Sequence, residues 1–310
     1  MKVAFLFPGQ GSQYVGMGAK LIEASESARR IFNEAERVLG FDVAALCKDG
    51  PDERLNLTEF TQPSILTVSA AALVVATERG LSASVVAGHS LGEYTALVYS
   101  GGLSFPDAVA LVRKRGRYMQ DAVPAGTGAM AAILGLDRAS VEAVCSEASV
   151  NGIVSAANIN SPAQIVIAGE KAAVEAAMAL AREKGAKRVL PLSVSVPSHC
   201  ALMKPAADRL SRDLEGVRFS PLKIPVVTNV SAVPINSGEQ AKKALVNQLE
   251  QPVLWVGSIE RMLGDGVTTF VEIGPGTVLS GLVKRIAKGA RIFNIEDPES
   301  LEATVRALAS

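Results

Sequence analysis

The sequence predicts an α/β protein with a mostly parallel sheet and a smaller subdomain inserted into it. Apolar runs at residues 3–7, 85–87 and 268–273 are typical of strands buried on both faces, and segments of helical periodicity lie between them. Over residues 128–191 the predicted order is instead strand, helix, strand, strand, helix, strand, which is the βαββαβ pattern of ferredoxin-like units. The alternation favours a parallel sheet, and the βαββαβ run favours a separate unit.

Composition indicates an ordinary globular protein. The chain has 310 residues, of which 48% are apolar and 20% are charged, so it can bury a sizeable core. Lys plus Arg and Asp plus Glu each number 31, so no net charge attracts nucleic acid or an anionic membrane. We therefore expect neither as a partner.

The expected compartment is the cytoplasm. Cys47, Cys145 and Cys200 are odd in number, far apart and without metal-ligand spacing, which argues against disulfides and a metal site. No signal peptide precedes the first predicted strand. The most apolar stretch, residues 65–76, is too short and too rich in small residues to span a bilayer. We expect a soluble monomer.

The first predicted strand, residues 3–7, ends in the loop Pro8–Gln13, PGQGSQ. Open α/β sheets place ligand-binding groups at the carboxyl ends of strands, and closely spaced glycines let backbone N–H groups approach a substrate. The loop lacks the third glycine and the Lys-Ser/Thr ending of a phosphate loop, so we exclude that interpretation. Helical periodicity follows over residues 25–39 and 62–79.

The pattern that indicates catalysis lies in residues 84–100. A strand leads directly into Gly88-His89-Ser90-Leu91-Gly92, and a helix is predicted from residue 93. This arrangement is a nucleophile elbow, the turn that presents a serine in α/β-hydrolase-like sheets. The two glycines permit a turn so tight that a side chain at either would clash, and Ser90 meets the N–H groups and dipole of the helix N-terminus. The alternative is a serine cap on an ordinary turn.

A helix is predicted from the cap Ser104 to about Ala122, and one residue on it is out of place. At 100° per residue, Arg115 lies in the middle of the apolar stripe. A guanidinium there keeps its charge and must find a partner or an anionic ligand. Periodicity alone leaves open an internal salt bridge or a side chain that snorkels to the rim.

The inserted subdomain is expected to span residues 125–192, which leaves residues 1–124 and 193–310 for an α/β-hydrolase-like catalytic domain. In the inserted subdomain, strands are predicted at residues 128–134, 153–157, 164–168 and 187–191, and helices at residues 138–148 and 170–184. Alternation from Leu190 to Val196 then predicts a strand that returns to the main sheet and stops at Pro197. The remaining predictions are a helix over 201–214, a strand over 224–229, a helix end or loop over 246–252, a strand over 268–273, a helix over 278–287 and a short helix from 297.

A serine hydroxyl needs an adjacent base, and the chain has only two histidines. His89 is next to Ser90 in the turn, where adjacent side chains point in different directions. His199 comes after the nucleophile, as the histidine does in α/β-hydrolase-like sheets, so we expect it to be the base. Cys200 is a rival nucleophile, but it has no elbow and is more typical of a buried apolar residue.

The other groups of the site are less determined. The available carboxylates have no distinctive setting, and a backbone carbonyl could equally orient the imidazole; these carboxylates are Asp208, Asp213, Asp265 and Glu272. The oxyanion of an attacked ester or thioester needs two donors. The N–H of Leu91 is one, and the Gly9-Gln10-Gly11 loop fits the second.

Together these segments resemble a known family. They are PGQGSQ at Pro8–Gln13, GHSLGE at Gly88–Glu93, RKRGRYMQ around Arg115, NINSP at Asn158–Pro162 and VPSHCALM at Val196–Met203. In this order they are similar to malonyl-CoA:acyl carrier protein transacylases and to the acyltransferase domains of fatty acid and polyketide synthases. The resemblance covers essentially the whole chain.

The resemblance implies a ping-pong transfer of malonyl from malonyl-CoA, through a serine ester, to the phosphopantetheine thiol of acyl carrier protein. It implies no bound cofactor, since the coenzyme A thioester is a substrate. Matching positions imply these roles: Ser90 and His199 catalytic, Gln10 and Leu91 oxyanion donors, Arg115 the carboxylate-binding residue, the Gln248 backbone carbonyl orienting the histidine, and Asn158 and His89 lining the site.

Three alternatives remain at this point. A serine esterase or thioesterase uses the same elbow with water as the acceptor; the arginine on an apolar face and the missing triad acid argue against it. A free-standing polyketide-type acyltransferase has the same motifs. A non-enzymatic scaffold that binds carrier protein is disfavoured by the presence of Ser90, His199 and Arg115 together.

Overall fold

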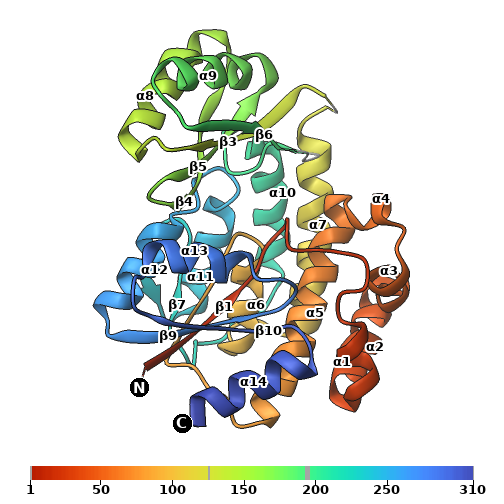
Figure 1. Cartoon of the computed structure of the whole chain (residues 1–310). Helices are drawn as coiled ribbons and strands as arrows, with labels where there is room; N and C mark the ends of the chain where they lie inside the picture. The colour runs from red at the N-terminus through yellow and green to blue at the C-terminus, as the bar shows by residue number, and fades with distance from the viewer. Residues whose placement is uncertain (1, 125, 193–195, 310) are drawn as a thin grey trace.

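The computed structural model describes residues 2–124, 126–192 and 196–309. It contains a six-stranded sheet in the order β10-β9-β1-β2-β7-β8 and a four-stranded sheet in the order β4-β5-β3-β6. Figure 1 shows the second sheet and its two helices at the end of the molecule opposite both chain termini. The predicted class, an α/β fold with a parallel main sheet and a separate small sheet, is confirmed.

The main sheet is parallel from β10 to β7, and only the edge strand β8 runs antiparallel. Along β1, Phe5 and Phe7 belong to one apolar core and Ala4 and Leu6 to the other, because successive side chains point to opposite faces. The strands are β1 Lys2–Phe7, β2 Val85–Gly88, β7 Val226–Val227, β8 Pro234–Ile235, β9 Val267–Ile273 and β10 Arg291–Ile295.

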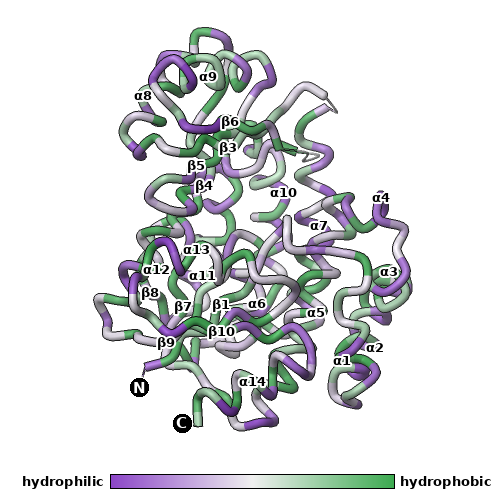
Figure 2. The backbone as a smooth tube through the Cα atoms, viewed as in Figure 1, coloured by the Kyte–Doolittle hydropathy of each residue, from purple (hydrophilic) through white to green (hydrophobic). Residues whose placement is uncertain are grey.

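Helices cover both faces of this sheet. The face of Ala4 and Leu6 is covered by α12 Trp255–Gly264 and α13 Val278–Ile286. The face of Phe5 and Phe7 is covered by the remaining helices of the main part: α1 Ala19–Ala24, α2 Glu26–Leu39, α3 Val43–Asp49, α4 Asp52–Leu55, α5 Thr58–Glu78, α6 Gly92–Tyr99, α7 Phe105–Ala122, α10 Lys204–Glu215, α11 Gly238–Asn247 and α14 Pro298–Ala309. In Figure 2 the outer helices alternate between polar and apolar residues, as helices with one buried face do.

The small sheet is antiparallel and lies between α7 and α10 in the chain. Its elements are β3 Gly128–Leu134, α8 Arg138–Ala148, the 3-10 turn η1 Ser149–Asn151, β4 Val154–Ser161, β5 Gln164–Glu170, α9 Lys171–Glu183 and β6 Arg188–Pro191. Both helices pack on one face of the sheet around a core that includes Ile133, Val144, Ile167 and Val174. The βαββαβ order is therefore as predicted.

Helix α5 contains the apolar stretch 65–76, which was expected not to span a bilayer, and extends beyond it at both ends. It has 21 residues and is long and apolar enough to cross a membrane by length and composition alone. However, 78% of its most apolar 18-residue window is buried inside the protein. Its apolar surface is used in the core, as is typical of a central helix.

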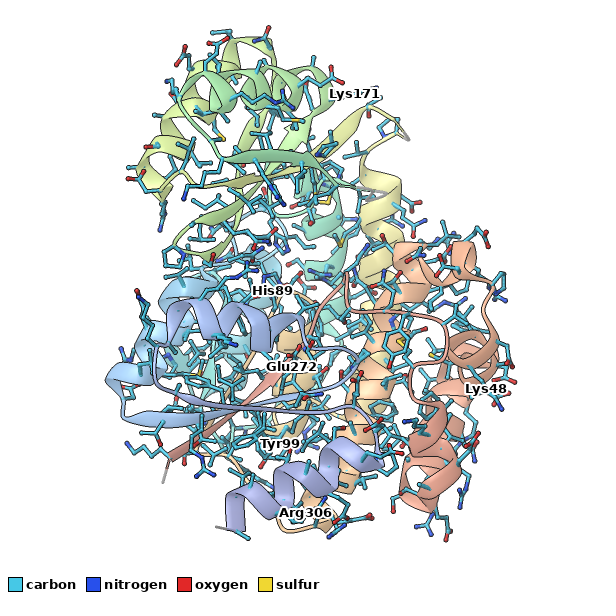
Figure 3. All side chains as sticks on the ribbon, viewed as in Figure 1. Lys48, His89, Tyr99, Lys171, Glu272 and Arg306 are labelled. Carbon is cyan, nitrogen blue, oxygen red and sulfur yellow. The ribbon has the colours of Figure 1, made fainter. Side chains whose placement is uncertain are left out.

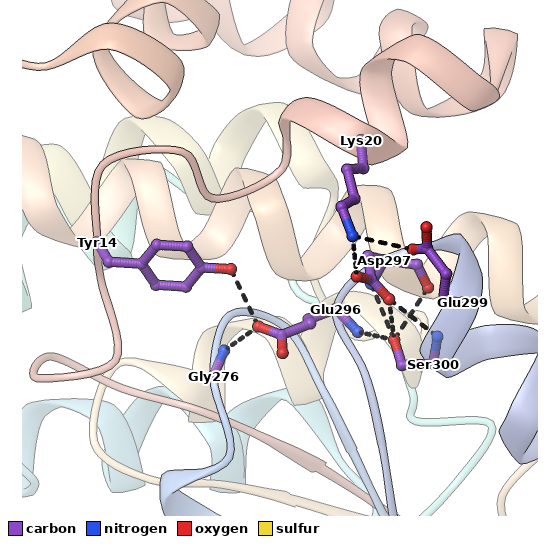
Figure 4. Close-up of polar contacts among 7 residues, drawn as sticks. All are labelled: Tyr14, Lys20, Gly276, Glu296, Asp297, Glu299 and Ser300. Atoms are coloured by element: carbon purple, nitrogen blue, oxygen red, sulfur yellow. Dashed lines mark hydrogen bonds and ion pairs between the residues drawn. The ribbon is translucent and has the colours of Figure 1, made fainter.

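The two ends of the chain are joined by a group of polar contacts (Figure 4). The Tyr14 hydroxyl donates to Glu296 Oε2 at 3.1 Å, and the same oxygen accepts from the Gly276 N–H at 2.8 Å. Lys20 Nζ lies 3.0 Å from Asp297 Oδ2 and 3.2 Å from Glu299 Oε2. The segment that follows the PGQGSQ loop is thus attached to the end of β10 and the start of α14.

Several local predictions differ from the structure. Asn158–Ser161 was expected to join two strands but continues β4, whose backbone pairs with Val253 through the bonds Ile159 N–H to Val253 O and Val253 N–H to Ala157 O, both 2.9 Å. Of the strand expected from Leu190 to Val196, residues 193–195 lie outside the described residues, and Leu192 and Val196 belong to no strand.

Downstream, the predicted strand at 224–229 is reduced to β7, and α10 follows the turn η2 Ala201–Met203. The elements α1, α3, α4, β8, α11, α12 and β10 were not predicted. Most of them are short or amphipathic and become ordered through contacts with the rest of the main domain.

Candidate active site

Ser90 occupies the turn between β2 and α6 in a conformation that non-glycine residues rarely adopt, with φ 51°. A Cβ added at Gly88 would lie 1.8 Å from the backbone carbon of Gly92, and one at Gly92 would lie 2.0 Å from the Phe7 carbonyl oxygen. The two glycines therefore permit the turn, as expected. The serine is presented between the end of the strand and the first turn of the helix.

His199 lies beside Ser90, although 109 residues separate them in the sequence. Its Nε2 is 2.8 Å from Ser90 Oγ, and its Nδ1 is 2.6 Å from the backbone carbonyl oxygen of Gln248. A carbonyl oxygen can only accept, so Nδ1 carries the hydrogen and Nε2 presents a lone pair to the serine hydroxyl. The backbone at His199 is also left-handed, with φ 62°.

The imidazole is held in its neutral form. The pKa of His199 is lowered to about 3, mainly by burial and secondarily by the nearby positive charge of Arg115. The carbonyl of Gln248 acts in the opposite direction but is weaker. A neutral imidazole with a free Nε2 lone pair is the form that can accept the serine proton.

Arg115 of α7 points into the same site. Its Nη2 donates to Ser90 Oγ at 3.1 Å and to the side-chain Oε1 of Gln248 at 3.0 Å. The side chain is 1% exposed, and its Nε has no hydrogen-bond partner among the described residues. No ion pair to Arg115 is found in the described part of the chain, so neither the internal salt bridge nor the snorkelling side chain describes it.

These groups line a pocket with a volume of about 180 Å³. Gln10 and Leu91 lie on its wall beside Ser90, and neither of their backbone N–H groups has an acceptor within the described residues. The side chain of Gln10 donates to Thr58 Oγ1 at 3.3 Å. Two unpaired N–H groups at one wall can stabilise a developing oxyanion.

Asn158 and His89 also line the pocket. Asn158 comes from β4, so the small sheet contributes one wall. His89 Nε2 lies 2.8 Å from Asn160 Oδ1, and its ring packs edge-on against Trp255 at 5.3 Å between centroids. Figure 3 shows His89 at the level where the main domain meets the small sheet. The His89 ring is therefore engaged by Asn160 and Trp255, and the histidine that bonds the serine hydroxyl is His199.

Neither of the weaker alternatives from the sequence lies at the serine. Cys200 is fully buried with its Sγ 3.3 Å from the Pro197 carbonyl oxygen, and burial raises its pKa to about 11. None of the four candidate triad carboxylates contacts His199: Asp208 pairs with Lys204, Asp213 with Lys114, Asp265 with Arg261, and Glu272 accepts from the N–H groups of Leu279 and Ser280. Within the described residues no cluster of His, Cys, Asp and Glu could hold a metal ion.

Two residues at the site were not singled out from the sequence. Glu93, in the first turn of α6, is 1% exposed, and burial raises its pKa to about 7. Its Oε2 accepts from the backbone N–H of Asn229 at 2.8 Å and from Gln248 Nε2 at 3.1 Å. The adjacency of Glu93 to the elbow was the only available signal; Asn229 had none beyond its place at a strand end.

A family model for the acyl transferase domain matches residues 4–299 of the chain. The chain belongs to the acyl transferase family. The matched range includes nearly all of both sheets and every residue of the pocket described above. This confirms the resemblance drawn from the motifs.

Curated and structural relatives in this family are similar over nearly their whole length. The malonyl CoA-acyl carrier protein transacylase of Escherichia coli strain K12 is 50% identical over 97% of this chain and 98% of its own. A crystal structure of an acyl carrier protein S-malonyltransferase from Vibrio cholerae is 50% identical, with a TM-score of 0.96 over 98% of this chain and 100% of its own. In a complex of a type II PKS acyl-carrier protein with its malonyl-transacylase, a chain is 49% identical, with a TM-score of 0.97 over 99% of this chain and 100% of its own.

Proposed function

We propose that this acyl transferase moves a malonyl group from malonyl-CoA to the phosphopantetheine thiol of acyl carrier protein, and so supplies fatty acid biosynthesis. The observation that carries the proposal is the convergence of three side chains in one pocket. Ser90 Oγ lies 2.8 Å from His199 Nε2 and 3.1 Å from Arg115 Nη2. The relatives named malonyl transacylase support the same substrates.

In the first half-reaction, Ser90 Oγ attacks the thioester carbonyl carbon while His199 Nε2 accepts the hydroxyl proton. The carbonyl oxygen becomes an oxyanion that accepts hydrogen bonds from the N–H groups of Gln10 and Leu91. When the intermediate collapses, the carbon–sulfur bond breaks and the proton passes from His199 to the coenzyme A sulfur. The product is a malonyl-serine ester.

The second half-reaction is the reverse sequence with a different thiol. His199 takes the proton of the phosphopantetheine thiol, and the sulfur attacks the ester carbonyl. The carbon–oxygen bond then breaks, and the proton returns to Ser90. The backbone carbonyl of Gln248 keeps the imidazole in the required tautomer in both halves, in the place of a triad acid.

Arg115 is proposed to select the acyl group. A buried guanidinium with an unpaired Nε matches the free carboxylate at the end of a malonyl chain, which it can hold with two parallel hydrogen bonds. An acyl group without a carboxylate would leave the charge unpaired. Asn158 and His89 are proposed to shape the walls around this chain.

The finer structural and cellular assignments belong to the same proposal. The catalytic domain, residues 1–124 and 193–310, is α/β-hydrolase-like, and residues 125–192 form a ferredoxin-like subdomain. The strand order β4-β5-β3-β6 supports the second assignment. The enzyme is proposed to be a cytoplasmic monomer that requires no resident cofactor and binds neither membrane nor nucleic acid.

Intact-mass analysis after mixing with malonyl-CoA tests the proposal. The chain should gain one malonyl group, the Ser90→Ala variant should gain none, and addition of carrier protein bearing phosphopantetheine should move the malonyl group to that protein. Absence of an adduct on the parent chain would reject the function. Rapid loss of the adduct to water, with free malonate and no carrier-protein product, would instead identify a thioesterase.

A further inference from the structure

We propose that Asn229 is the positioning residue that holds the nucleophile elbow in its reactive conformation, an inference that rests on the proposed function of Ser90. Asn229 lies just beyond the end of β7 and is fully buried. Its side chain contacts the turn on both sides of His89. Its hydrogen bonds to the turn go to the backbone, whereas Ser90 Oγ bonds Arg115 and His199, so we infer that Asn229 acts through the backbone.

The two contacts are short and complementary. Asn229 Oδ1 accepts from the Ser90 N–H at 2.6 Å, and Asn229 Nδ2 donates to the Gly88 carbonyl oxygen at 2.6 Å. Strand β2 pairs with β7 through Val86–Val226 and Ala87–Val227, and this pairing ends before Gly88. Beyond the last paired residues, the Asn229 side-chain amide therefore makes the two hydrogen bonds to the β2 side that a further residue of β7 would otherwise make with its backbone.

The hydrogen bond from the Ser90 N–H to Asn229 Oδ1 stabilises a residue with strained backbone. Ser90 has φ 51°, and a serine in this left-handed region persists only when the surroundings over-determine it. Gly88 and Gly92 make the turn sterically possible, but they do not hold it. The amide of Asn229 binds the N–H of the strained residue itself.

The orientation of the Asn229 amide is fixed by its neighbours. Gln248 Nε2 donates to the same Oδ1 at 3.2 Å. A flipped amide would therefore turn its NH2 group toward two other donors, the Ser90 N–H and Gln248 Nε2, and its oxygen toward the Gly88 carbonyl oxygen. The backbone N–H of Asn229 donates to Glu93 Oε2 at 2.8 Å, and its carbonyl accepts from the Leu254 N–H at 2.8 Å. The bond to Leu254 therefore anchors Asn229 independently of the elbow.

Through Gln248 the same network reaches the other two side chains at the serine. The Gln248 side chain accepts from Arg115 and donates to the Ser90 carbonyl oxygen at 3.0 Å, while its backbone carbonyl binds His199. Gln248 keeps its bonds to the Ser90 carbonyl oxygen and to Glu93 when the Asn229 side chain is removed, so we expect Arg115 and the pocket walls to remain in place. Substitution of Asn229 should then lower the rate of serine acylation more than the affinity for malonyl-CoA.

The experiment measures single-turnover acylation by malonyl-CoA and, separately, labelling of Ser90 by a fluorophosphonate, which requires a reactive serine but no malonyl recognition. Asn229→Ala removes both hydrogen bonds. Asn229→Asp is nearly isosteric, keeps the acceptor for the Ser90 N–H and loses the donor to Gly88. Leu301→Ala, in α14 away from the site, is the control for a general loss of stability.

We expect kcat for acylation and the labelling rate to fall about 10²-fold in Asn229→Ala and about 10-fold in Asn229→Asp, with KM changed less than about threefold. The inference is overturned if both Asn229 variants keep parental rates, or if they lose no more than Leu301→Ala at an equal melting temperature. If Asn229→Ala does not fold, the Asn229→Asp result decides. A parent chain that labels with the fluorophosphonate but forms no malonyl ester would reject the proposed function and leave the positioning role testable by labelling.

Discussion

At the scale of single residues, a buried cation beside a hydroxyl is the feature on which acyl selectivity should depend. Arg115 lies among apolar residues of α7, and burial lowers its pKa from the ordinary value without removing its charge. Gln248 accepts a hydrogen bond from the guanidinium, and the centre of the Tyr94 ring lies 5.8 Å from the guanidinium carbon. Neither contact is an ion pair. A carboxylate ligand would supply the negative charge that the described protein groups around Arg115 do not pair with it.

Replacement of Arg115 tests this dependence. Arg115→Ala should lower malonyl-serine formation about 30-fold or more, because truncation of one partner in a buried charge pair costs about 2–5 kcal/mol. Formation of acetyl-serine should persist or increase. The measurement is acyl-enzyme formation from malonyl-CoA and from acetyl-CoA, with the exposed Arg117→Ala as control on the same helix. An unchanged malonyl preference would remove Arg115 from substrate recognition.

The lowered pKa of His199 predicts an unusual acid profile. Catalysis requires the neutral imidazole, which exists above the pKa; with that pKa near 3, lowered mainly by burial, the base stays competent in mild acid. We expect kcat/KM for acylation to show no loss attributable to His199 between about pH 7.5 and 5, since this profile reports the free enzyme.

Glu93 is the control for this profile, because its pKa is raised by burial to about 7 and it titrates in the same range. The profile should therefore also be recorded for Glu93→Gln, which removes that carboxyl and keeps an acceptor. An acid limb near the ordinary histidine value in both proteins would show that His199 is not held neutral.

At the scale of elements, the turn between β2 and α6 requires glycines that leave no room for a side chain, whereas other glycines of the chain have open space around them. Gly92→Ala places a Cβ 2.0 Å from the Phe7 carbonyl oxygen, a clash with backbone that no rotamer relieves. We expect it to lower the free energy of unfolding by about 1–3 kcal/mol or more. Acylation should be lost with it, because the turn must move.

The matched control is Gly281→Ala in α13, where an added Cβ meets no atom within 4 Å. A helical Gly→Ala change with open space should raise the free energy of unfolding by about 0.5–1 kcal/mol. Denaturant unfolding of both variants measures whether the free energy of unfolding falls in Gly92→Ala and rises in Gly281→Ala. A Gly92→Ala protein as stable as the parent would contradict the account of the elbow.

The elements with strong local signals were predicted well. Helices α2, α7 and α8 have caps whose side chains accept from the backbone, at Ser25, Ser104 and Asp137, and their ends agree closely with the structure. The two-residue strand β7 and the continuation of β4 past Asn158 were not predictable in the same way. Their pairing partners are Ala87 and Val253, which are remote in the sequence, so tertiary contacts decide their length.

At the scale of the whole molecule, the small sheet closes the pocket and is joined to the main domain near the serine. Asn160 at the end of β4 bonds His89 within the elbow, at 2.8 Å. Backbone bonds between β4 and Val253 continue this attachment. The position of the small sheet therefore bears directly on the turn that carries Ser90.

Asn160→Ala should loosen this attachment. The partly buried His89 loses its partner, so we expect a loss of about 1 kcal/mol in the free energy of unfolding and faster hydrogen exchange at the Ile159 amide, which bonds Val253. Asn151→Ala is the control, since the one hydrogen bond found for the Asn151 side chain among the described residues is to the neighbouring Ala148 carbonyl oxygen. Equal exchange at Ile159 in both variants would contradict a joining role for Asn160.

The sequence by itself determined the fold class, the elbow at Ser90 and the family, because these depend on patterns within short segments: strand, glycines, helix and the order of the motifs. Tertiary structure alone decided that His199, Gln248 and Arg115 meet at the serine and that Asn229 binds the turn. Ser90 and Asn229 are 139 residues apart, and no local propensity relates them. Their meeting results from the parallel pairing of β2 with β7, which places the carboxyl ends of both strands at the same edge of the sheet.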